Sequence, residues 1–524
     1  MIKLFTRTCF VCFILVFNLP ANLFSQNIGI GTATPNVSAK LDITSTNSGL
    51  LPPRMTAAQR YAIVNPVPGL IIFNTTTQSI EIYTTYGWSK MKSEVPGSNR
   101  LLGGNQIEQP KSIRNISTGG YIIAGSSTSS ANGDISNTNH GGLDIWLVEL
   151  DHYGNIENDR LIGGNGNESA NDIQPTSDGG FIMAGYSTSS ANGDVYATNH
   201  GLKDYWILKT DGSGDIEWSR LLGGNDDDEA FSVQPTSDGG YIVGGHSSSS
   251  ANGDVTATNH GSSDYWIIKL DGAGNIVWNK LLGGNDTETF LGLQQTSDGG
   301  YILTGSSRSS ANGNVTGTTH GGVDEWIVKL DGSGNIVWNK LLGGNWSELA
   351  LSIQQTSDGG YIIGGASGSS NSGDVTATNH GTSAFGIDNF DCWIVKLNST
   401  GSIVWNKLLG GNNIDAAYSI LQTADGGYII AGLATSSLNG DVSYTNHGLE
   451  DYWIVKIDGT GNILWNKLYG GNKEDGAYCI RQTTDGLFIV AGYSNSSTNG
   501  DVSASSHGSS DYWILRLDAN GNIF

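Results

Sequence analysis

The sequence has few basic residues and few cysteines. Its 524 residues include 26 Lys or Arg against 49 Asp or Glu, so the formal net charge is −23. Proteins that bind nucleic acid need clusters of Lys and Arg against the phosphates, so this balance argues against a nucleic-acid partner. Of the four cysteines, Cys9 and Cys12 lie near the N-terminus. The other two, Cys392 and Cys479, cannot form a framework of disulfides.

Long apolar runs are equally scarce. The run at the N-terminus, Cys9–Phe17, follows Lys3 and Arg7 and is too short to cross a bilayer as a helix. This order of basic, apolar and small residues predicts a secretory signal peptide over residues 1–25. We therefore expect a protein that is secreted, extracellular or held at the cell surface, with no transmembrane segment in the mature chain.

Glycine, in contrast, is abundant at 75 residues and marks an internal repeat. The phrase "DGGY" or a close variant recurs every 60 residues at Gly120, Gly180, Gly240, Gly300 and Gly360, and then at Gly427 and Leu487. The one longer step comes from seven extra residues within Thr382–Trp393. A fixed period over most of a chain is typical of repeat architectures.

Each repeat predicts four strands joined by tight turns and one long loop, because its runs alternate in polarity and are bounded by Gly, Asn and Asp. In "DYWIIKL", Trp266 and Ile268 share one face while Tyr265 shares the other with Ile267. Each sheet should therefore pack between two neighbours. No stretch of useful length has helical periodicity. The prediction is an all-β fold with a seven-bladed β-propeller of four-stranded blades.

The phase of the repeat at its two ends favours a closed ring over a linear solenoid. Within the repeat, Ser98 occupies the position of Trp278, and Phe524 occupies the position of Val277, one residue earlier. The first residues of the repeat region therefore continue the unit at the point where the last residues leave it. We expect the two ends to complete one sheet. A truncated reading frame is the alternative explanation for a break within a strand. The propeller is assigned to residues 95–524.

Every repeat carries a histidine, an aspartate and a tryptophan in the same order. The histidines are His140, His200, His260, His320, His380, His447 and His507. The aspartates are Asp144, Asp204, Asp264, Asp324, Asp391, Asp451 and Asp511, and the tryptophans are Trp146, Trp206, Trp266, Trp326, Trp393, Trp453 and Trp513. Zinc needs three or four ligands at one point, whereas a ring spreads equivalent residues around its circumference. A structural role follows, with His and Asp hydrogen-bonded and Trp packed between blades.

Calcium is the metal that the loops could hold. Hard cations prefer carboxylates on flexible loops, and Asn-Gly-Asp turns or close variants place candidates at Asp134, Asp194, Asp254, Asp374, Asp441 and Asp501. Asn314 takes this position in the fourth copy. Asn-Gly-Asp is also ordinary turn chemistry, so both interpretations stay open. No other cofactor is expected.

No sequence motif for catalysis is present. The chain has no G-x-S-x-G elbow, H-E-x-x-H helix or P-loop. One active site would have to break the symmetry of the repeats, and the departures include Trp346 in a link between repeats and Phe385 and Phe390 in the insertion. Aromatic side chains with polar neighbours suit sugar rings, so these three are the candidate ligand-binding residues. Local packing is the alternative.

Residues 26–94 differ from the repeats and predict a small β-rich N-terminal module. A short helix is expected after Pro53 and a hairpin over Gly69–Met91. So small a unit buries a limited core. It should therefore pack on the propeller or form an oligomer.

Two resemblances cover nearly all of the mature chain. The segments "NIGIGTATP", "SGLLPPRMT" and "GLIIFNTTT" resemble the N-terminal modules of secreted surface proteins of gliding-type, type IX-secreting bacteria, and also phage tail-fibre tips. The repeat "TSDGGYII" with "WIVKLDGSGNI" resembles the repeats of secreted β-propeller proteins of the same bacteria and, more distantly, delta-60 repeats. The resemblance implies extracellular binding or adhesion and supplies no catalytic residues.

We therefore expect a non-enzymatic binding or adhesion protein that recognises an extracellular glycan or protein on one face of the propeller. Because strand direction alternates, this face should carry the long loops within the repeats and the links between them, and we call it the loop face. A polysaccharide-active hydrolase or lyase is the first alternative, and a structural component of the envelope is the second. A propeller scaffold can serve all three functions.

Overall fold

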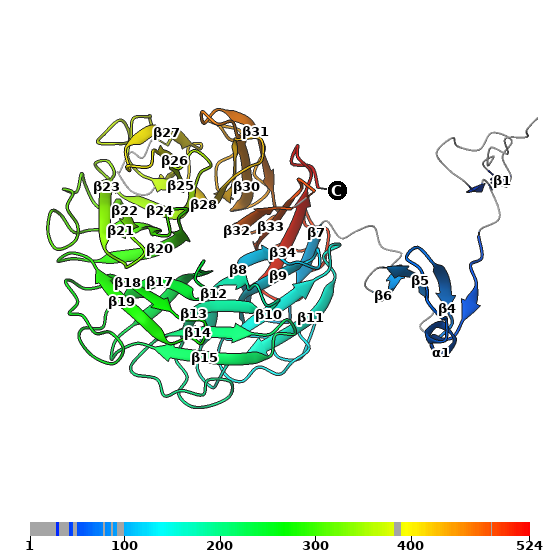
Figure 1. Cartoon of the computed structure of the whole chain (residues 1–524). Helices are drawn as coiled ribbons and strands as arrows, with labels where there is room; N and C mark the ends of the chain where they lie inside the picture. Colours follow the sequence, from blue (N-terminus) through cyan, green and yellow to red (C-terminus); the bar gives the residue numbers. More distant parts are fainter. Residues whose placement is uncertain are drawn as a thin grey trace, which may run out of the picture. The chain divides into compact units, whose positions relative to one another are not determined.

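The computed structural model describes residues 28–30, 41–43, 45, 50–76, 79–84, 87–91, 99–381, 389–483 and 485–523. The chain divides into two compact units, Met1–Val95 and Pro96–Phe524 (Figure 1). The predicted signal peptide and Phe385 lie outside the described residues.

The second unit is a β-propeller of seven blades, each a four-stranded antiparallel sheet (Figure 1). Blades 1 and 2 consist of β8 (Glu108–Asn115), β9 (Tyr121–Ser127), β10 (Asp144–Leu150), β11 (Ile156–Ile162), and β12 (Glu168–Pro175), β13 (Phe181–Ser187), β14 (Asp204–Thr210), β15 (Ile216–Leu222). Blades 3 and 4 consist of β16 (Asp228–Pro235), β17 (Tyr241–Ser247), β18 (Asp264–Leu270), β19 (Ile276–Leu282), and β20 (Glu288–Gln295), β21 (Tyr301–Ser307), β22 (Asp324–Leu330), β23 (Ile336–Leu342). The fold class predicted from the sequence is confirmed.

The last three blades follow the same order. Blades 5 and 6 consist of β24 (Glu348–Gln355), β25 (Tyr361–Ser367), β26 (Asp391–Leu397), β27 (Ile403–Leu409), and β28 (Asp415–Gln422), β29 (Tyr428–Ala434), β30 (Asp451–Ile457), β31 (Ile463–Tyr469). Blade 7 consists of β32 (Asp475–Gln482), β33 (Phe488–Ser494), β34 (Asp511–Leu517) and β7 (Asn99–Leu102). The first strands of successive blades contact one another in an unbroken circle, and the contact between β32 and β8 completes it.

Blade 7 is assembled from both ends of the repeat region. In β7, Leu101 pairs with Trp513 and Leu102 pairs with Tyr512 of β34. Ile523 bridges to Leu517 further along the same outer edge. The phase argument from the sequence therefore holds, and the closed ring excludes the linear solenoid.

The core consists of seven apolar clusters, one between each pair of neighbouring blades. In β18, Trp266 and Ile268 belong to the cluster shared with blade 2. Tyr265 and Ile267 belong to the cluster shared with blade 4. Each sheet is thus buried on both faces, as the apolar residues on both faces of "DYWIIKL" predicted.

The first unit contains two small sheets. Their elements are β1 (Ile28–Ile30), β2 (Leu41–Ile43), β3 (Arg54–Met55), α1 (Ala57–Tyr61), β4 (Ile71–Asn74), β5 (Ser79–Thr84) and β6 (Gly87–Met91). The strands β1 and β2 pair in parallel, and the other sheet has the order β3-β4-β5-β6. The expected short helix and hairpin are both present, and the hairpin has β6 as a third strand.

Local hydrogen bonds fix the helix of this unit. Thr56 caps α1 by accepting from the Gln59 backbone N–H, and the Gln59 side chain accepts from the Thr56 N–H. Arg60 is buried and contacts Glu81 of β5 at 2.6 Å. Among the residues that the structure describes, no helix has the length and apolar character needed to cross a membrane.

Candidate functional site

The repeated His and Asp residues contact each other within each blade. His260 Nδ1 lies 2.6 Å from Asp264 Oδ2, and the His260 backbone N–H donates to the same oxygen at 3.0 Å. The seven blades share this contact, with Nδ1–Oδ2 distances from 2.6 to 3.3 Å. Burial raises the pKa of Asp264, while the two hydrogen bonds from His260 oppose the shift. The pair anchors the long loop to the start of the third strand.

The same imidazole also reaches the next blade. In five blades, His Nε2 lies 3.6 to 3.9 Å from the carboxylate of the following Asn-Gly-Asp or Ser-Gly-Asp turn. One of these contacts, between His507 and Asp134, crosses the closure between blades 7 and 1. The repeated Trp side chains are buried between blades, and Trp266 Nε1 donates to Asn279 at 3.4 Å. The structure thus places these three residue types in contacts that hold blades together.

The candidate calcium ligands are hydrogen-bonded to the glycines of the links between blades. The Asp254 backbone N–H donates to Gly223 O at 2.9 Å, and its Oδ2 accepts from the Gly223 N–H at 3.3 Å. Asn314 makes the equivalent contact with Gly283 at 3.2 Å. The described residues hold no group of three or more His, Cys, Asp or Glu arranged to bind a metal ion.

These contacts lead to a prediction about calcium. Each turn carboxylate already accepts a backbone N–H, so we expect no stabilisation by a bound cation. Differential scanning fluorimetry with an excess of EDTA and with 5 mM CaCl₂ should give melting temperatures within about 1 °C of each other. A rise of several degrees with calcium would instead support the calcium interpretation of the turns.

Two of the three candidate ligand-binding residues lie together on the loop face. Trp346 is 50% exposed, and Phe390 is half-buried. A Cβ atom built on Gly368 would lie 3.6 Å from Trp346 Cβ and 3.7 Å from Phe390 Cε1. The two aromatic side chains therefore flank one spot on blade 5.

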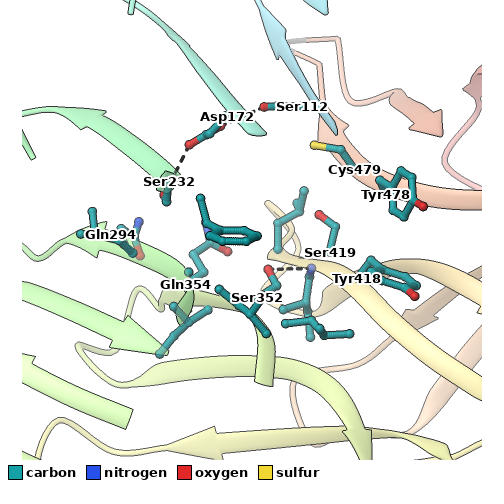
Figure 2. A pocket seen from close by; sticks show the side chains of 18 of the residues that line it. Ser112, Asp172, Ser232, Gln294, Ser352, Gln354, Tyr418, Ser419, Tyr478 and Cys479 are labelled. Atoms are coloured by element: carbon teal, nitrogen blue, oxygen red, sulfur yellow. Dashed lines mark hydrogen bonds between the residues drawn. The ribbon is translucent and has the colours of Figure 1, made fainter. Parts of the chain in front are cut away.

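A second site, which the sequence did not predict, lies at the centre of the ring. Residues from the first strand of all seven blades line a cavity of about 560 Å³. Figure 2 shows side chains from these strands, among them Asp172, Tyr418 and Tyr478, around one shared space. We call this cavity the axial channel.

The blades differ most at one position of the strands that line the axial channel. Where each of these strands pairs with the second strand of its blade, the pairing skips one residue of the first strand. Such a register shift is typical of a β-bulge. The skipped residues are half-buried and line the channel: Lys111, Asn171, Phe231, Leu291, Leu351, Tyr418 and Tyr478. At this one position of the repeat, the seven blades therefore place five different residue types around the same cavity.

Blades 6, 7 and 1 form an aromatic and cationic arc in the axial channel. The Tyr418 and Tyr478 rings meet edge to face, with centroids 5.3 Å apart. Lys111 Nζ lies 4.9 Å from the centroid of the Tyr478 ring. Burial lowers the pKa of Lys111 and raises the pKa of Tyr478 to about 12, so each group is partly desolvated.

In another part of the channel wall, Arg114 and Asp172 form an ion pair. Their closest nitrogen and oxygen atoms are 2.6 Å apart, and the Ser112 hydroxyl donates to the same carboxylate oxygen at 2.9 Å. The other carboxylate oxygen accepts from the Val233 backbone N–H at 3.1 Å. Because its partners come from blades 1 and 3, Asp172 links three blades and is fully occupied as an acceptor.

Arg481 lies beside this pair without an acidic partner. Its guanidinium donates to Ile480 O at 2.7 Å. Burial and the neighbouring Arg114 charge lower the pKa of Arg481. Within the described part of the chain, no carboxylate lies within 4.0 Å of either Arg481 or Lys111.

Comparison with known proteins adds two findings from sequence. Residues 29–108 match the family model of a phage tail-like trimerisation region. The chain is also 25% identical over 141 residues to the regulatory protein FlaEY of Caulobacter vibrioides, a match that covers 25% of this chain and 14% of that protein. The chain therefore spans about one seventh of the length of this relative.

Solved structures of unlike proteins have a similar architecture. Hydrazine synthase of Kuenenia stuttgartiensis has a TM-score of 0.46 at 9% identity, with 80% of this chain and 98% of that chain covered. The Pan2 WD40 domain of Neurospora crassa has a TM-score of 0.43 at 10% identity, with 82% and 98% covered. A puromycin hydrolase has a TM-score of 0.44 at 12% identity, with 79% and 52% covered.

Proposed function

We propose that the chain is a secreted or cell-surface, non-enzymatic binding protein that recognises a glycan in the axial channel. The observation that carries this proposal is the convergence of unlike side chains at the ring centre, since binding a defined ligand needs such a set at one place. Tyr418 and Tyr478 offer planar surfaces for a sugar ring, and the neighbouring Lys111 ammonium offers hydrogen-bond donors. The resemblance of the N-terminal segments and the repeats to secreted surface proteins of gliding-type bacteria supports the same extracellular role.

The channel favours binding over hydrolysis. Glycoside cleavage by the usual route needs two carboxyl groups across the scissile bond. Asp172 is the one carboxylate among the described residues that line the channel, and its ion pair with Arg114 occupies it. A lone, paired carboxylate supplies neither a general acid nor a free base.

The test of this proposal is electrophoresis in native gels cast with different polysaccharides and then stained for the polymer. We expect the mature chain, residues 26–524, to be retarded in at least one gel without any loss of polymer around the band. Clearing around the band would overturn the proposal in favour of a polysaccharide-active enzyme.

We further propose that the N-terminal unit holds several copies of the chain together. The match to a trimerisation region supports this proposal, as do apolar side chains that this unit leaves exposed, such as Leu51 at 69%, Tyr61 at 75% and Val64 at 83%. Joining three propellers would raise the avidity for a repetitive polymer by about 10²- to 10⁴-fold.

The variant Val64→Lys tests self-association. A charge on the exposed apolar surface of the N-terminal unit should shift the native oligomer to monomer in multi-angle light scattering. Val277→Lys is the matched control, because Val277 is 60% exposed on the propeller, and it should leave the mass unchanged. A monomeric native chain would contradict the proposal.

A further inference from the structure

The charge inside the axial channel has the opposite sign to that of the whole chain. The chain carries a formal net charge of −23. The described residues that line the channel include three cationic side chains, Lys111, Arg114 and Arg481, and one carboxylate, Asp172. The lining of the axial channel is therefore positively charged although the chain as a whole is acidic, and the channel is also where the repeats differ in sequence.

One of the three cations has an ion-pair partner and two do not. Arg114 is paired with Asp172 at 2.6 Å. Arg481 donates to a backbone carbonyl, and Lys111 faces the Tyr478 ring. A desolvated cation without a counter-ion is costly, and a bound anion would relieve that cost. Burial lowers the pKa of Lys111 against the opposing charge of Glu229. Burial with the Arg114 charge lowers the pKa of Arg481 against the opposing charge of Asp172.

The remaining wall of the channel suits a ring-shaped group. Phe231, Leu291 and Leu351 line it on blades 3, 4 and 5, outside the arc of blades 6, 7 and 1. Pyranose rings have apolar C–H faces and polar edges. The apolar wall would accept the C–H face while the cations reach the acidic substituent.

We infer that the axial channel binds the acidic groups of an anionic polysaccharide, uronate carboxylates or sulfate esters, through Lys111 and Arg481. This inference rests on the proposed glycan-binding function and specifies the class of glycan. Both anions present oxygen acceptors that an ammonium and a guanidinium bind with charge-assisted hydrogen bonds. Neutral glycans leave the two cations without a counter-ion and are excluded on this ground.

The experiment uses the mature chain in native gels that contain polygalacturonate, dextran sulfate or dextran. We expect retardation by one or both anionic polymers and none by dextran. Retardation by polygalacturonate alone identifies a carboxylate, and retardation by dextran sulfate alone identifies a sulfate ester. Loss of one charge-assisted contact in Lys111→Met or Arg481→Met should weaken binding by about 10- to 100-fold.

A charge-matched control separates the channel from the loop face. Lys473 is exposed in a link between blades, so Lys473→Met removes one positive charge away from the channel and should bind as the native chain does. A melting temperature no lower than that of the native chain shows that each Met variant is folded, and the two channel variants test the site independently.

The outcomes distinguish the two proposals. Retardation by dextran that equals retardation by the anionic polymers would overturn the anionic inference and leave the glycan-binding proposal standing. So would anion binding that Lys473→Met weakens as much as the channel variants do. Clearing of any polymer would overturn the non-enzymatic function, and the absence of retardation in all three gels would overturn both.

Discussion

Replacing Leu101 and Leu102 together with alanine is expected to lower the free energy of unfolding by about 4–8 kcal/mol, because each buried Leu-to-Ala change costs about 2–4 kcal/mol. Leu101 is 4% exposed and packs in the cluster between blades 6 and 7. Leu102 is fully buried in the cluster between blades 7 and 1. The double variant therefore weakens both sides of blade 7, where the ring closes without a covalent link between neighbouring strands.

Urea denaturation followed by tryptophan fluorescence measures this effect. Val277→Ala is the matched control, because Val277 lies on an outer strand but is 60% exposed; its cost should stay within about 0.5 kcal/mol. A double variant within 1 kcal/mol of the native chain would contradict closure of the ring by β7.

Replacing Glu325 with tyrosine is expected to stabilise the propeller by about 2–4 kcal/mol, the cost of leaving a buried carboxyl without partners plus one gained hydrogen bond. Glu325 is fully buried, and neither carboxyl oxygen has a hydrogen-bond partner among the described residues. At the same position of blade 3, the Tyr265 hydroxyl donates to Trp326 O of the next blade at 3.2 Å.

The space around Glu325 suits the larger ring. The Tyr265 hydroxyl lies over Gly305, and Gly365 is the equivalent residue of the blade that faces Glu325. Tyr265 also meets Phe290, where the next blade has the smaller Ala350. The substitution should therefore extend to blade 4 a contact that several other blades already make.

Glu325 also gives the native chain an unusual dependence on pH. Burial, with nearby carboxylates, raises the pKa of Glu325 well above its ordinary value. A carboxyl that binds its proton more tightly in the folded state contributes fully to stability below the unfolded pKa of about 4.3, and that contribution is lost as pH rises toward the folded pKa. Burial also raises the pKa of Asp228 to about 6 and of Asp415 to about 7. The three groups act in the same direction.

Thermal unfolding between pH 5 and pH 8 tests this account. The native chain should become less stable as pH rises through this window, and Glu325→Tyr should be more stable at every pH and show a shallower slope. Glu325→Gln keeps the shape of the side chain but cannot titrate. Its stability should therefore depend on pH as weakly as that of Glu325→Tyr, with a smaller gain in stability. A native stability that rises from pH 5 to pH 8 would contradict the raised pKa values.

The sequence predicts the ring much better than the site. The phase match of Ser98 with Trp278 and the apolar residues on both faces of "DYWIIKL" determine blade number, closure and packing, because these depend on features that every repeat shares. The channel depends on what the repeats do not share. In one sequence, Lys111 and Tyr478 look like ordinary variation at one position of a strand.

Two further properties could not be read from the sequence. The β-bulge that turns this position toward the axis is a feature of backbone register and leaves no distinctive residue. The proximity of Trp346 to Phe390 arises from the fold of blade 5, because Trp346 lies in a link between blades and Phe390 lies in the insertion. Aligning the seven repeats with one another and looking for the position that varies most could have identified the residues of the channel from the sequence.

The central claim is that the axial channel recognises a glycan without cleaving it, and one measurement tests it most directly. The native chain, Tyr418→Ala/Tyr478→Ala and Trp346→Ala are run in a native gel with the polymer that retards the native chain. The account predicts that the double tyrosine variant migrates freely, that Trp346→Ala stays retarded, and that the polymer stays intact around every band. Free migration of Trp346→Ala with full retardation of the tyrosine variant would contradict it and place recognition on the loop face.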